Sequence, residues 1–262
     1  MTVNTIYIKE VDSTNRWLRD YQPTTDEGLT VVWTDYQSAG RGCGSNTWES
    51  EAGKNLTFSV LIRPQGVPAK EQFILSMANA LALKETLDNY VEGITIKWPN
   101  DIYWHDRKIC GTLIETSLRG SEIHDCIIGT GLNVNQQQFM SDATNPVSLA
   151  QILGHEVDRD EVLRQVMERL NSLFTQVTQG EWAEIRSRYR AALYRKGEVH
   201  PYRYPDGTEE RLLLLDVTDD GYLLLLQPQR GELLSFAFKE IAFTYSPSET
   251  ESESKTNSNE SL

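Results

Sequence analysis

The chain has 262 residues, 39% of them hydrophobic and 24% charged, which is the composition of a globular protein with a sizeable core. Its 38 acidic and 25 basic side chains give a net charge of −13, which disfavours a dedicated DNA- or RNA-binding role. No apolar stretch is long enough to span a membrane, and the N-terminal residues lack the features of a signal peptide. The three cysteines are far apart, which fits neither a disulfide framework nor a zinc site and favours a reducing cytoplasm.

Strand-like and helix-like segments alternate along the first 193 residues. Runs rich in β-branched and aromatic residues predict strands at residues 5–11, 29–34, 56–63, 93–97, 108–118 and 126–129. Helices are predicted after the capping residues at 12–15, after Pro68, and twice between residues 158 and 193, with Gly180 separating the last two. This alternation predicts an α+β domain over residues 1–193, with helices packed on a mixed β-sheet.

A different pattern begins after residue 193. Short apolar runs at residues 211–217, 221–227, 232–238 and 240–245 are joined by turns of the Asp-Gly and Arg-Gly type. Their spacing predicts a small antiparallel β-barrel over residues 194–245. Residues 246–262 contain six serines, four glutamates and no aromatic residue, so we expect them to form a disordered acidic tail.

Two segments near the N-terminus have the polar or glycine-rich character of a binding site. Residues 12–15, Asp-Ser-Thr-Asn, are either a helix cap or a cluster of donors and acceptors suited to a neutral polar group such as a urea. Residues 36–48 place three glycines in five positions, but they match neither a P-loop nor a dinucleotide-binding fingerprint. Arg41, between two of these glycines, suits a carboxylate or a phosphate, and Trp48 offers a flat ring to a base. A flexible surface turn is the alternative.

Two further segments lie at the ends of predicted strands. Residues 97–101, Lys-Trp-Pro-Asn-Asp, form either a simple turn or a site where Asn100 and Asp101 hold a nucleotide or a magnesium ion. Lys108 and Gly111 follow, although an isolated lysine is usually a solvated surface charge. Residues 129–135 form a glycine-spaced turn after an apolar strand, which is a common arrangement. Each segment alone has an ordinary structural explanation.

In this order, Asp-Ser-Thr-Asn, Gly-Arg-Gly followed by Trp48, Lys-Trp-Pro-Asn-Asp, Arg-Lys-Ile-Cys-Gly and Gly-Thr-Gly-Leu-Asn closely resemble the motifs of the biotin–protein ligase family. The resemblance spans about residues 5–193, and the C-terminal barrel resembles the SH3-like domain of those enzymes. It implies the mixed sheet of class II synthetases and a two-step reaction. Biotin's carboxylate attacks the α-phosphate of MgATP to form biotinyl-5′-AMP, and a lysine of a biotin carboxyl carrier domain then accepts the biotinyl group. Such a reaction needs charge neutralisation and alignment rather than a protein nucleophile.

The resemblance also implies roles for individual residues. Lys108 and Arg41 would be the catalytic side chains, with Lys108 bridging biotin's carboxylate and the adenylate phosphate. The implied biotin-binding residues are Ser13, Thr14, Asn15, Gln37, Gly40, Arg41, Gly42, Lys108 and Gly111. The implied residues for ATP or the adenylate are Arg41, Trp48, Asn100, Asp101, Lys108, Gly131 and Asn133. Asp101 would also assist the Mg²⁺ ion that accompanies ATP, whereas apolar residues within 56–60 would line the biotin chain or simply pack in the core.

The sequence departs from the family pattern in two places. The glycine-rich loop of the family often reads Gly-Arg-Gly-Arg-x-Gly-Arg-x-Trp, but here Cys43 and Asn46 replace arginines and Ser45 replaces a glycine. The first predicted strand begins within about five residues of Met1, which leaves no room for the N-terminal winged helix-turn-helix of some relatives. We therefore expect a monofunctional ligase that does not bind DNA or a membrane and acts in the cytoplasm.

Three other functions compete with this interpretation. A lipoate– or octanoate–protein ligase shares the architecture, but its acyl group would leave Ser13, Thr14 and Gln37 without hydrogen-bond partners. A biotin-sensing transcription regulator would need the missing DNA-binding domain, and a non-catalytic binding module would not need Lys108. The sequence leaves open which carrier proteins are modified, the oligomeric state and the role of residues 246–262.

The substitutions in the glycine-rich loop generate a prediction. With fewer arginines over the adenylate, biotinyl-5′-AMP should escape faster than it does from arginine-bearing relatives. Restoring one positive charge with Cys43→Arg should slow this escape, which can be measured as the release of preformed intermediate into solution. An unchanged rate of release from the variant would contradict the expectation.

Overall fold

The computed structural model describes residues 1–22, 28–44, 46–140 and 145–244. The chain divides into two compact units, one of residues 1–194 with 219–221, and one of residues 195–218 with those from 222 onward. The expected tail at 246–262 and Ser45 lie outside the described residues. No helix in the described part of the chain is long and apolar enough to cross a membrane.

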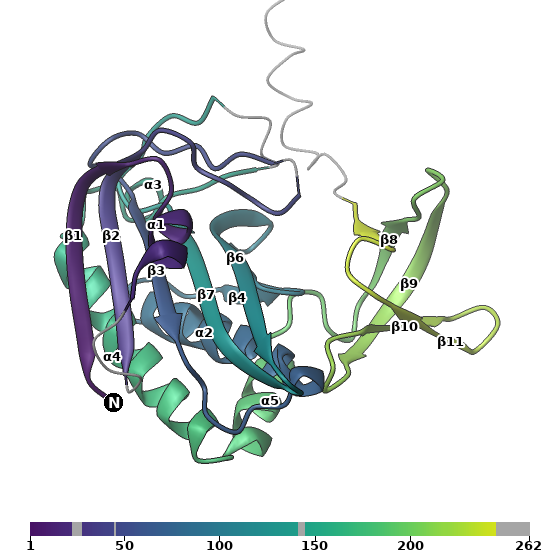
Figure 1. Cartoon of the computed structure of the whole chain (residues 1–262). Helices are drawn as coiled ribbons and strands as arrows, with labels where there is room; N and C mark the ends of the chain where they lie inside the picture. The colour runs from purple at the N-terminus through teal and green to yellow at the C-terminus, as the bar shows by residue number, and fades with distance from the viewer. Residues whose placement is uncertain (23–27, 45, 141–144, 245–262) are drawn as a thin grey trace, which may run out of the picture. The chain divides into compact units, whose positions relative to one another are not determined.

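The first unit is built on a seven-stranded sheet (Figure 1). In spatial order its strands are β1 (Val3–Val11), β2 (Leu29–Gln37), β3 (Leu56–Ile62), β7 (Glu122–Leu132), β6 (Arg107–Arg119), β5 (Asp101–Trp104) and β4 (Ile94–Lys97). β1 and β2 pair in parallel and all other neighbours pair antiparallel, which confirms the predicted mixed sheet. β3 is buried along its whole length, as its uninterrupted run of apolar and small residues requires.

Two strands of this sheet differ from the expectation. β7 starts at Glu122 instead of residue 126, because its polar first half pairs with the exposed end of β6 in a long hairpin. β5 has no predicted counterpart. It is four residues long and begins directly after the turn at residues 98–100, so no alternation of apolar residues marks it.

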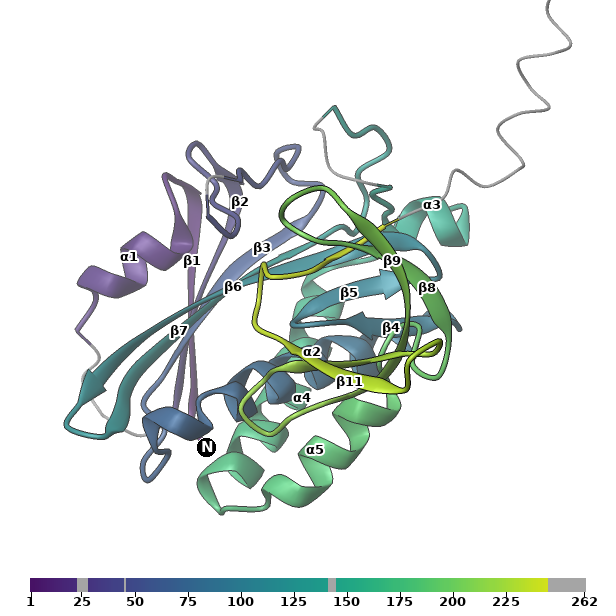
Figure 2. The same cartoon turned by 90° about the vertical axis from the view of Figure 1, so that its right-hand side faces the viewer.

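Helices cover the two faces of the sheet unequally (Figures 1 and 2). One face is covered by a layer of longer helices, α2 (Phe73–Leu87), α4 (Arg159–Thr178) and α5 (Trp182–Ala191), while η1 (Ala69–Glu71) and α3 (Leu149–Leu153) are short turns in connections. Twelve of the fifteen residues of α2 are buried, because this helix lies between the sheet and the other two helices. The opposite face carries only the short α1 (Thr14–Asp20) among the helices described, where Leu18 packs against Val32, Leu61 and Ile127. That face is therefore largely free to be lined by loops.

The second unit is an antiparallel five-stranded sheet. Its strands in spatial order are β11 (Glu232–Phe236), β10 (Leu223–Gln227), β9 (Glu209–Val217), β8 (Val199–Arg203) and β12 (Ala242–Phe243). Alternate residues of β9 and β10 are buried, including Leu212, Leu214 and Leu225, as expected for strands with one face in a core. The sheet agrees with the small β-barrel expected here. β8 was not expected, because His200 and Pro201 interrupt its apolar pattern.

A charged link joins β1 and β2 to the beginning of α4 in the first unit. Tyr7 on β1 donates a hydrogen bond to Asp35 Oδ2 at 2.6 Å, and Arg159 Nη2 lies 3.0 Å from Asp35 Oδ1. Arg159 Nη1 also donates to the carbonyl oxygen of Asn55 at 3.0 Å. The hydrogen bond from Tyr7, and then the one from Arg159, hold the pKa of Asp35 below its ordinary value although burial opposes this.

The lowered pKa predicts how Asp35→Asn affects stability. A carboxylate whose pKa is lowered by folding stabilises the native state above its ordinary pKa of 3.8, and this contribution disappears as the pH falls below that value. We expect the variant to lose about 1 kcal/mol of unfolding free energy at neutral pH, a modest figure because the pair is partly solvated. Urea unfolding at neutral and at strongly acidic pH checks this, and an equal loss at both would contradict it.

Candidate functional site

The start of α1 places a polar cluster against the end of β2. Ser13 is the N-cap residue and Thr14 and Asn15 begin the helix, and all three are almost fully buried. Gln37, the last residue of β2, accepts hydrogen bonds at Oε1 from Thr14 N at 2.8 Å and from Thr14 Oγ1 at 2.9 Å. Gln37 Nε2 lies close to Gly40, where a Cβ would approach it to 3.2 Å. The amide of Gln37 thus connects α1 to the glycine-rich segment.

A buried hydroxyl on β3 completes this cluster. Ser59 is fully buried, and its Oγ lies 2.6 Å from both Thr14 Oγ1 and Asn15 Oδ1. Asn15 Nδ2 donates to Glu115 Oε2 at 2.9 Å. The close approach depends on Gly129, because a Cβ at that position would lie only 2.2 Å from Asn15 Oδ1. Both ends of the Asn15 amide are therefore used to attach α1 to the sheet.

The glycine-rich segment forms a short hairpin. Arg41 and Thr47 are antiparallel bridge partners, and Trp48 N donates to the carbonyl oxygen of Gly40 at 3.1 Å. The side chain of Arg41 is 43% exposed, and its Nη1 lies 3.7 Å from Glu115 Oε1. The hairpin therefore holds a guanidinium group above the sheet, next to the polar cluster.

Trp48 lies flat against a pair of glycines on β6 and β7. Gly111 and Gly131 are register partners, and a Cβ at Gly131 would lie 2.1 Å from Trp48 Cε2. A Cβ at Gly111 would lie 3.1 Å from Trp48 Cζ3. The Nε1–H group of Trp48 is buried and has no acceptor within the described ranges. The indole ring therefore occupies the space that side chains at Gly111 and Gly131 would fill.

Lys108 approaches the same glycines from the beginning of β6. Its Nζ lies 2.7 Å from Asp101 Oδ2, and the two side chains are 27% and 24% exposed. Asp101 opens β5 directly after Asn100, which lies in the preceding turn. A Cβ at Gly111 would lie 3.2 Å from Lys108 Cε, so the lysine side chain passes close to the ring of Trp48. The site thus has a second cation with an acidic partner.

Asn133 follows the end of β7 and is buried. Its Nδ2 donates to the carbonyl oxygen of Val147 at 3.1 Å, and its Oδ1 has no donor in the part of the chain that the structure describes. Lys108 N donates in turn to the carbonyl oxygen of Asn145 at 2.8 Å. The segment around Val147 therefore fixes Asn133 beside the strand that carries Lys108.

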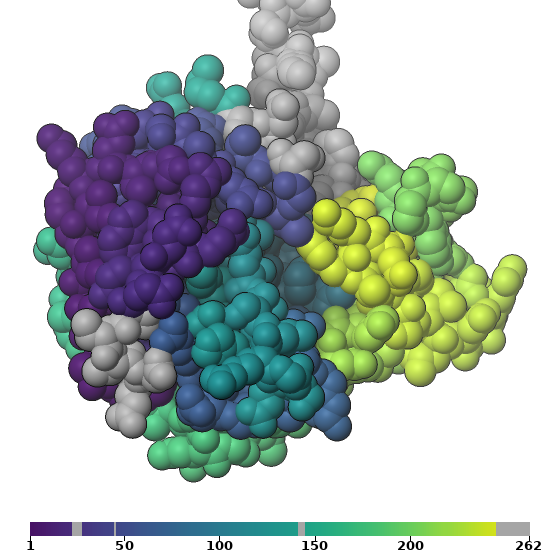
Figure 3. Space-filling view, viewed as in Figure 1, coloured from purple at the N-terminus to yellow at the C-terminus, as the bar shows by residue number. Residues whose placement is uncertain are grey.

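The structure links ten of the residues predicted from sequence through contacts on the sheet face that carries α1, namely Thr14, Asn15, Gln37, Gly40, Arg41, Trp48, Asp101, Lys108, Gly111 and Gly131. Ser13, Gly42, Asn100 and Asn133 lie in the adjoining segments. In the space-filling view, the purple atoms of the N-terminal segment lie against the teal atoms of β6 and β7 on this face (Figure 3). A cavity of about 380 Å³ lies elsewhere, between the first two strands and α4, and contains none of them. Among the described residues no three His, Cys, Asp or Glu side chains form a metal-binding cluster. A magnesium ion at Asp101 would therefore take most of its ligands from phosphates or water.

Sequence reasoning missed two residues of this site, Ser59 and Glu115, and gave no individual role to Gly129 although it named the motif that begins there. Ser59 could have been noticed as a hydroxyl in an otherwise apolar buried strand, because such a group needs a partner. Glu115 is an acid within the predicted strand at 108–118, a position that usually indicates a solvent-facing side chain. Its partners Arg19 and Asn15 lie 96 and 100 residues away in sequence, so no local signal identifies them.

Known proteins resemble the chain in sequence. A family model described as the Biotin/lipoate A/B protein ligase family matches residues 7–133. The bifunctional ligase/repressor BirA of Bacillus subtilis is 32% identical over 167 residues, which are 62% of this chain and 51% of BirA. The biotin–[acetyl-CoA-carboxylase] ligase of Paracoccus denitrificans is 31% identical over 231 residues, which are 86% of this chain and 94% of that protein. The chain spans about half the length of the bifunctional relatives that it matches.

A solved structure also resembles the fold. The biotin protein ligase from Aquifex aeolicus, in complex with biotin and ATP, aligns with a TM-score of 0.77. The alignment covers 93% of this chain and 99% of that chain, at 26% sequence identity. The likeness therefore extends through both sheets.

The contact between Gly129 and Asn15 yields a prediction. Gly129→Ala would place a methyl group inside the Asn15 side chain, which should displace α1 and cost about 1–3 kcal/mol of stability. Asn15→Ala removes the colliding atoms, so the double variant should be more stable than the sum of the two single losses predicts. Thermal unfolding of the three variants checks the coupling, and strictly additive losses would show that the two residues do not collide.

Proposed function

Because the chain belongs to the biotin–protein ligase family, we propose that it is an ATP-dependent, AMP-forming biotin–[acetyl-CoA-carboxylase] ligase. In the first step biotin's carboxylate oxygen attacks the α-phosphorus of ATP, and pyrophosphate leaves with the electrons of the broken P–O bond. In the second step a lysine amine of a carrier protein attacks the carbonyl carbon of biotinyl-5′-AMP. An amide bond forms, and AMP leaves.

The observation that carries this proposal is the position of two kinds of groups on one sheet face. A neutral, buried set of donors and acceptors surrounds Thr14 and Gln37, and two cations, Arg41 and Lys108, lie beyond it. Biotin has the matching polarity, since its ureido group is neutral and polar and its carboxylate is at the other end. Ser13, Thr14 and Gln37 would bind the ureido group, and Asn15 would hold them in place. A lipoyl or octanoyl group has no ureido group, so it would form no hydrogen bonds with this set in return for covering it.

The cations address the main difficulty of the first step, which joins two anions. Lys108 Nζ would lie between the carboxylate and the α-phosphate and reduce their repulsion, while Arg41 would close over the same phosphate. The chain need not supply a nucleophile, because biotin and the carrier lysine provide them. Lys108 is paired with Asp101 in the structure, so the ligand's anions would share this lysine with an internal carboxylate.

The nucleotide would occupy the region of Trp48, Gly131 and Asn133. The flat ring of Trp48 lies against strands that carry only glycines at that point, which suits stacking with a planar base. The buried Oδ1 of Asn133 has no donor in the described residues and suits an exocyclic amine of that base. Mg²⁺ would reach the site with the phosphates of ATP and neutralise their charge, with Asp101 Oδ1 and Asn100 nearby. The described cysteines Cys43, Cys110 and Cys126 are free thiols, in keeping with action in the cytoplasm on a biotin carboxyl carrier domain.

ATP–pyrophosphate exchange tests the proposal most directly. With biotin, lipoate or octanoate supplied in turn, we expect exchange with biotin only. Lys108→Ala should reduce its rate at least about a hundredfold, because the lysine acts where charge accumulates. Lys84→Ala is a matched control, since Lys84 pairs with Asp88 at 2.6 Å on α2, away from the site, and should exchange at the wild-type rate. Exchange with lipoate or octanoate alone would show that the protein is a ligase for that acyl group. No exchange by the folded protein with any of the three would refute the proposal.

A further inference from the structure

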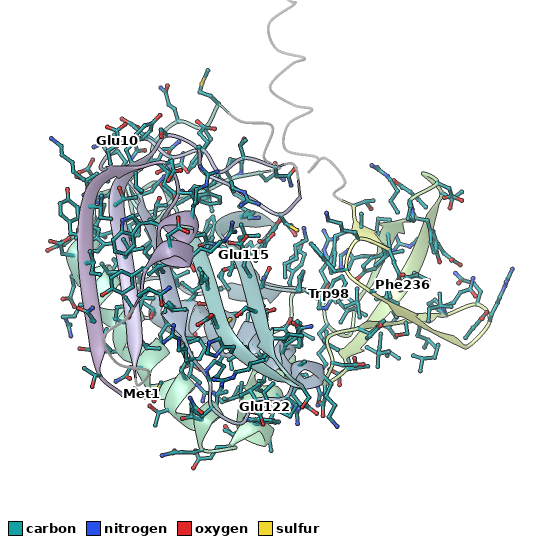
Figure 4. The ribbon with its side chains drawn as sticks, viewed as in Figure 1. Met1, Glu10, Trp98, Glu115, Glu122 and Phe236 are labelled. Carbon is teal, nitrogen blue, oxygen red and sulfur yellow. The ribbon has the colours of Figure 1, made fainter. Side chains whose placement is uncertain are left out.

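Glu115 occupies the centre of the polar contacts between α1, the glycine-rich hairpin and β6 (Figure 4). Its Oε1 lies 2.7 Å from Arg19 Nη2, and its Oε2 accepts a hydrogen bond from Asn15 Nδ2 at 2.9 Å. Its side chain is 25% exposed, about half the exposure of Arg19. The Glu115 carboxylate is therefore held from two sides by α1, independently of the hairpin.

Arg41 approaches this fixed carboxylate loosely. The separation of 3.7 Å between Arg41 Nη1 and Glu115 Oε1 exceeds hydrogen-bond distance, and Arg41 is 43% exposed. Arg41 is also the one basic residue in the segment 40–48. Any negative charge that this hairpin covers must therefore be bound by a guanidinium group that already has an acid beside it.

We propose that Glu115 is an internal counter-ion that competes with the anionic part of the ligand for Arg41 and thereby limits how long the site retains it. Glu115 acts through Arg41 and need not touch the ligand, so it is a positioning residue. The identity of the anion, the adenylate phosphate, rests on the proposed function. When that phosphate enters, Arg41 turns from Glu115 towards it, while Arg19 and Asn15 keep Glu115 in place.

Two effects of Glu115 oppose each other, and their sizes decide the sign. Glu115 could aid binding by holding Arg41 ready, or it could weaken binding by sharing the positive charge and repelling the ligand. The Arg41 side chain is almost half exposed and forms no hydrogen bond with Glu115. Glu115 therefore does little to fix the orientation of Arg41. The charge of Glu115, by contrast, is held in place by Arg19 and Asn15 whether or not the ligand is bound, and at one-quarter exposure it is only partly screened. Competition therefore outweighs preorganisation.

Binding of inorganic pyrophosphate to the full chain, measured by calorimetry at low ionic strength, tests the inference without biotin or turnover. Glu115→Gln keeps an oxygen for Asn15 but removes the charge. It should lower the half-saturating pyrophosphate concentration by about three- to tenfold. In the Arg41→Gln background the same substitution should have no such effect. Arg19→Gln should act in the opposite direction, because it leaves the charge of Glu115 less compensated.

Two controls separate this role from a structural one. Glu168→Gln makes the same change in net charge on α4, where Glu168 is 63% exposed, and should leave pyrophosphate binding within about twofold of wild type. Biotin methyl ester has no anionic group, so its affinity should not change in Glu115→Gln, whereas a disturbed α1 would weaken it. With biotin and MgATP, Glu115→Gln should also release preformed biotinyl-5′-AMP about three- to tenfold more slowly.

The outcomes distinguish this inference from the proposed function. Three outcomes would overturn the counter-ion role. Glu115→Gln could bind pyrophosphate no more tightly than wild type, or it could raise the pyrophosphate affinity equally in the Arg41→Gln background. No variant binding pyrophosphate at all would also overturn it. Absence of biotin-dependent exchange, together with the expected order of pyrophosphate affinities, would instead overturn the proposed function and leave the counter-ion role standing.

Discussion

The candidate site depends on the absence of side chains at the centre of one sheet face. The backbone carries no side chains where α1 and the hairpin pack on the sheet, a bare patch formed by Gly129 and Gly131 on β7 and Gly111 on β6. A Cβ at Gly129 would lie 2.2 Å from an atom of Asn15, and a Cβ at Gly131 would lie 2.1 Å from an atom of Trp48. Without this bare patch, neither the polar cluster nor the indole ring could approach the strands.

The electrostatics of the site follow from a chain with a net charge of −13 that is proposed to bind anions. The two cations of the site are each paired with an acid, Arg41 with Glu115 and Lys108 with Asp101. Such pairing neutralises the site in the absence of ligand, and ligand phosphates must compete with internal carboxylates. The two pairs differ, because Lys108 is hydrogen-bonded to its acid whereas Arg41 is only near its own. The hairpin cation is thus the more readily exchanged of the two.

The sequence predicted the mixed sheet, its principal strands and most of the groups on its open face. Strong local signals made this possible, such as the apolar run of β3 and the capping residues before α1. β5 and β8 escaped prediction because one is too short to show a period and the other contains a proline and a histidine. Ser59 and Glu115 escaped it because their roles come from partners in distant strands and helices, which only the pairing of the sheet brings together. Residue roles toward ligands remain predictions from family resemblance and geometry.

The pairing of β6 with β7 has a consequence for the fidelity of folding. In the second half of β7, odd-numbered residues such as Gly129 and Gly131 face α1. Even-numbered residues such as Ile128 and Thr130 face the layer of longer helices. A slip of one residue would exchange the two sets, because side chains alternate strictly along a strand. Isoleucine and threonine would then fill the bare patch, and glycines would leave holes beneath α2. A chain that misfolds in this way is both blocked and unstable, so cellular quality control that removes unstable chains would also remove the inactive ones.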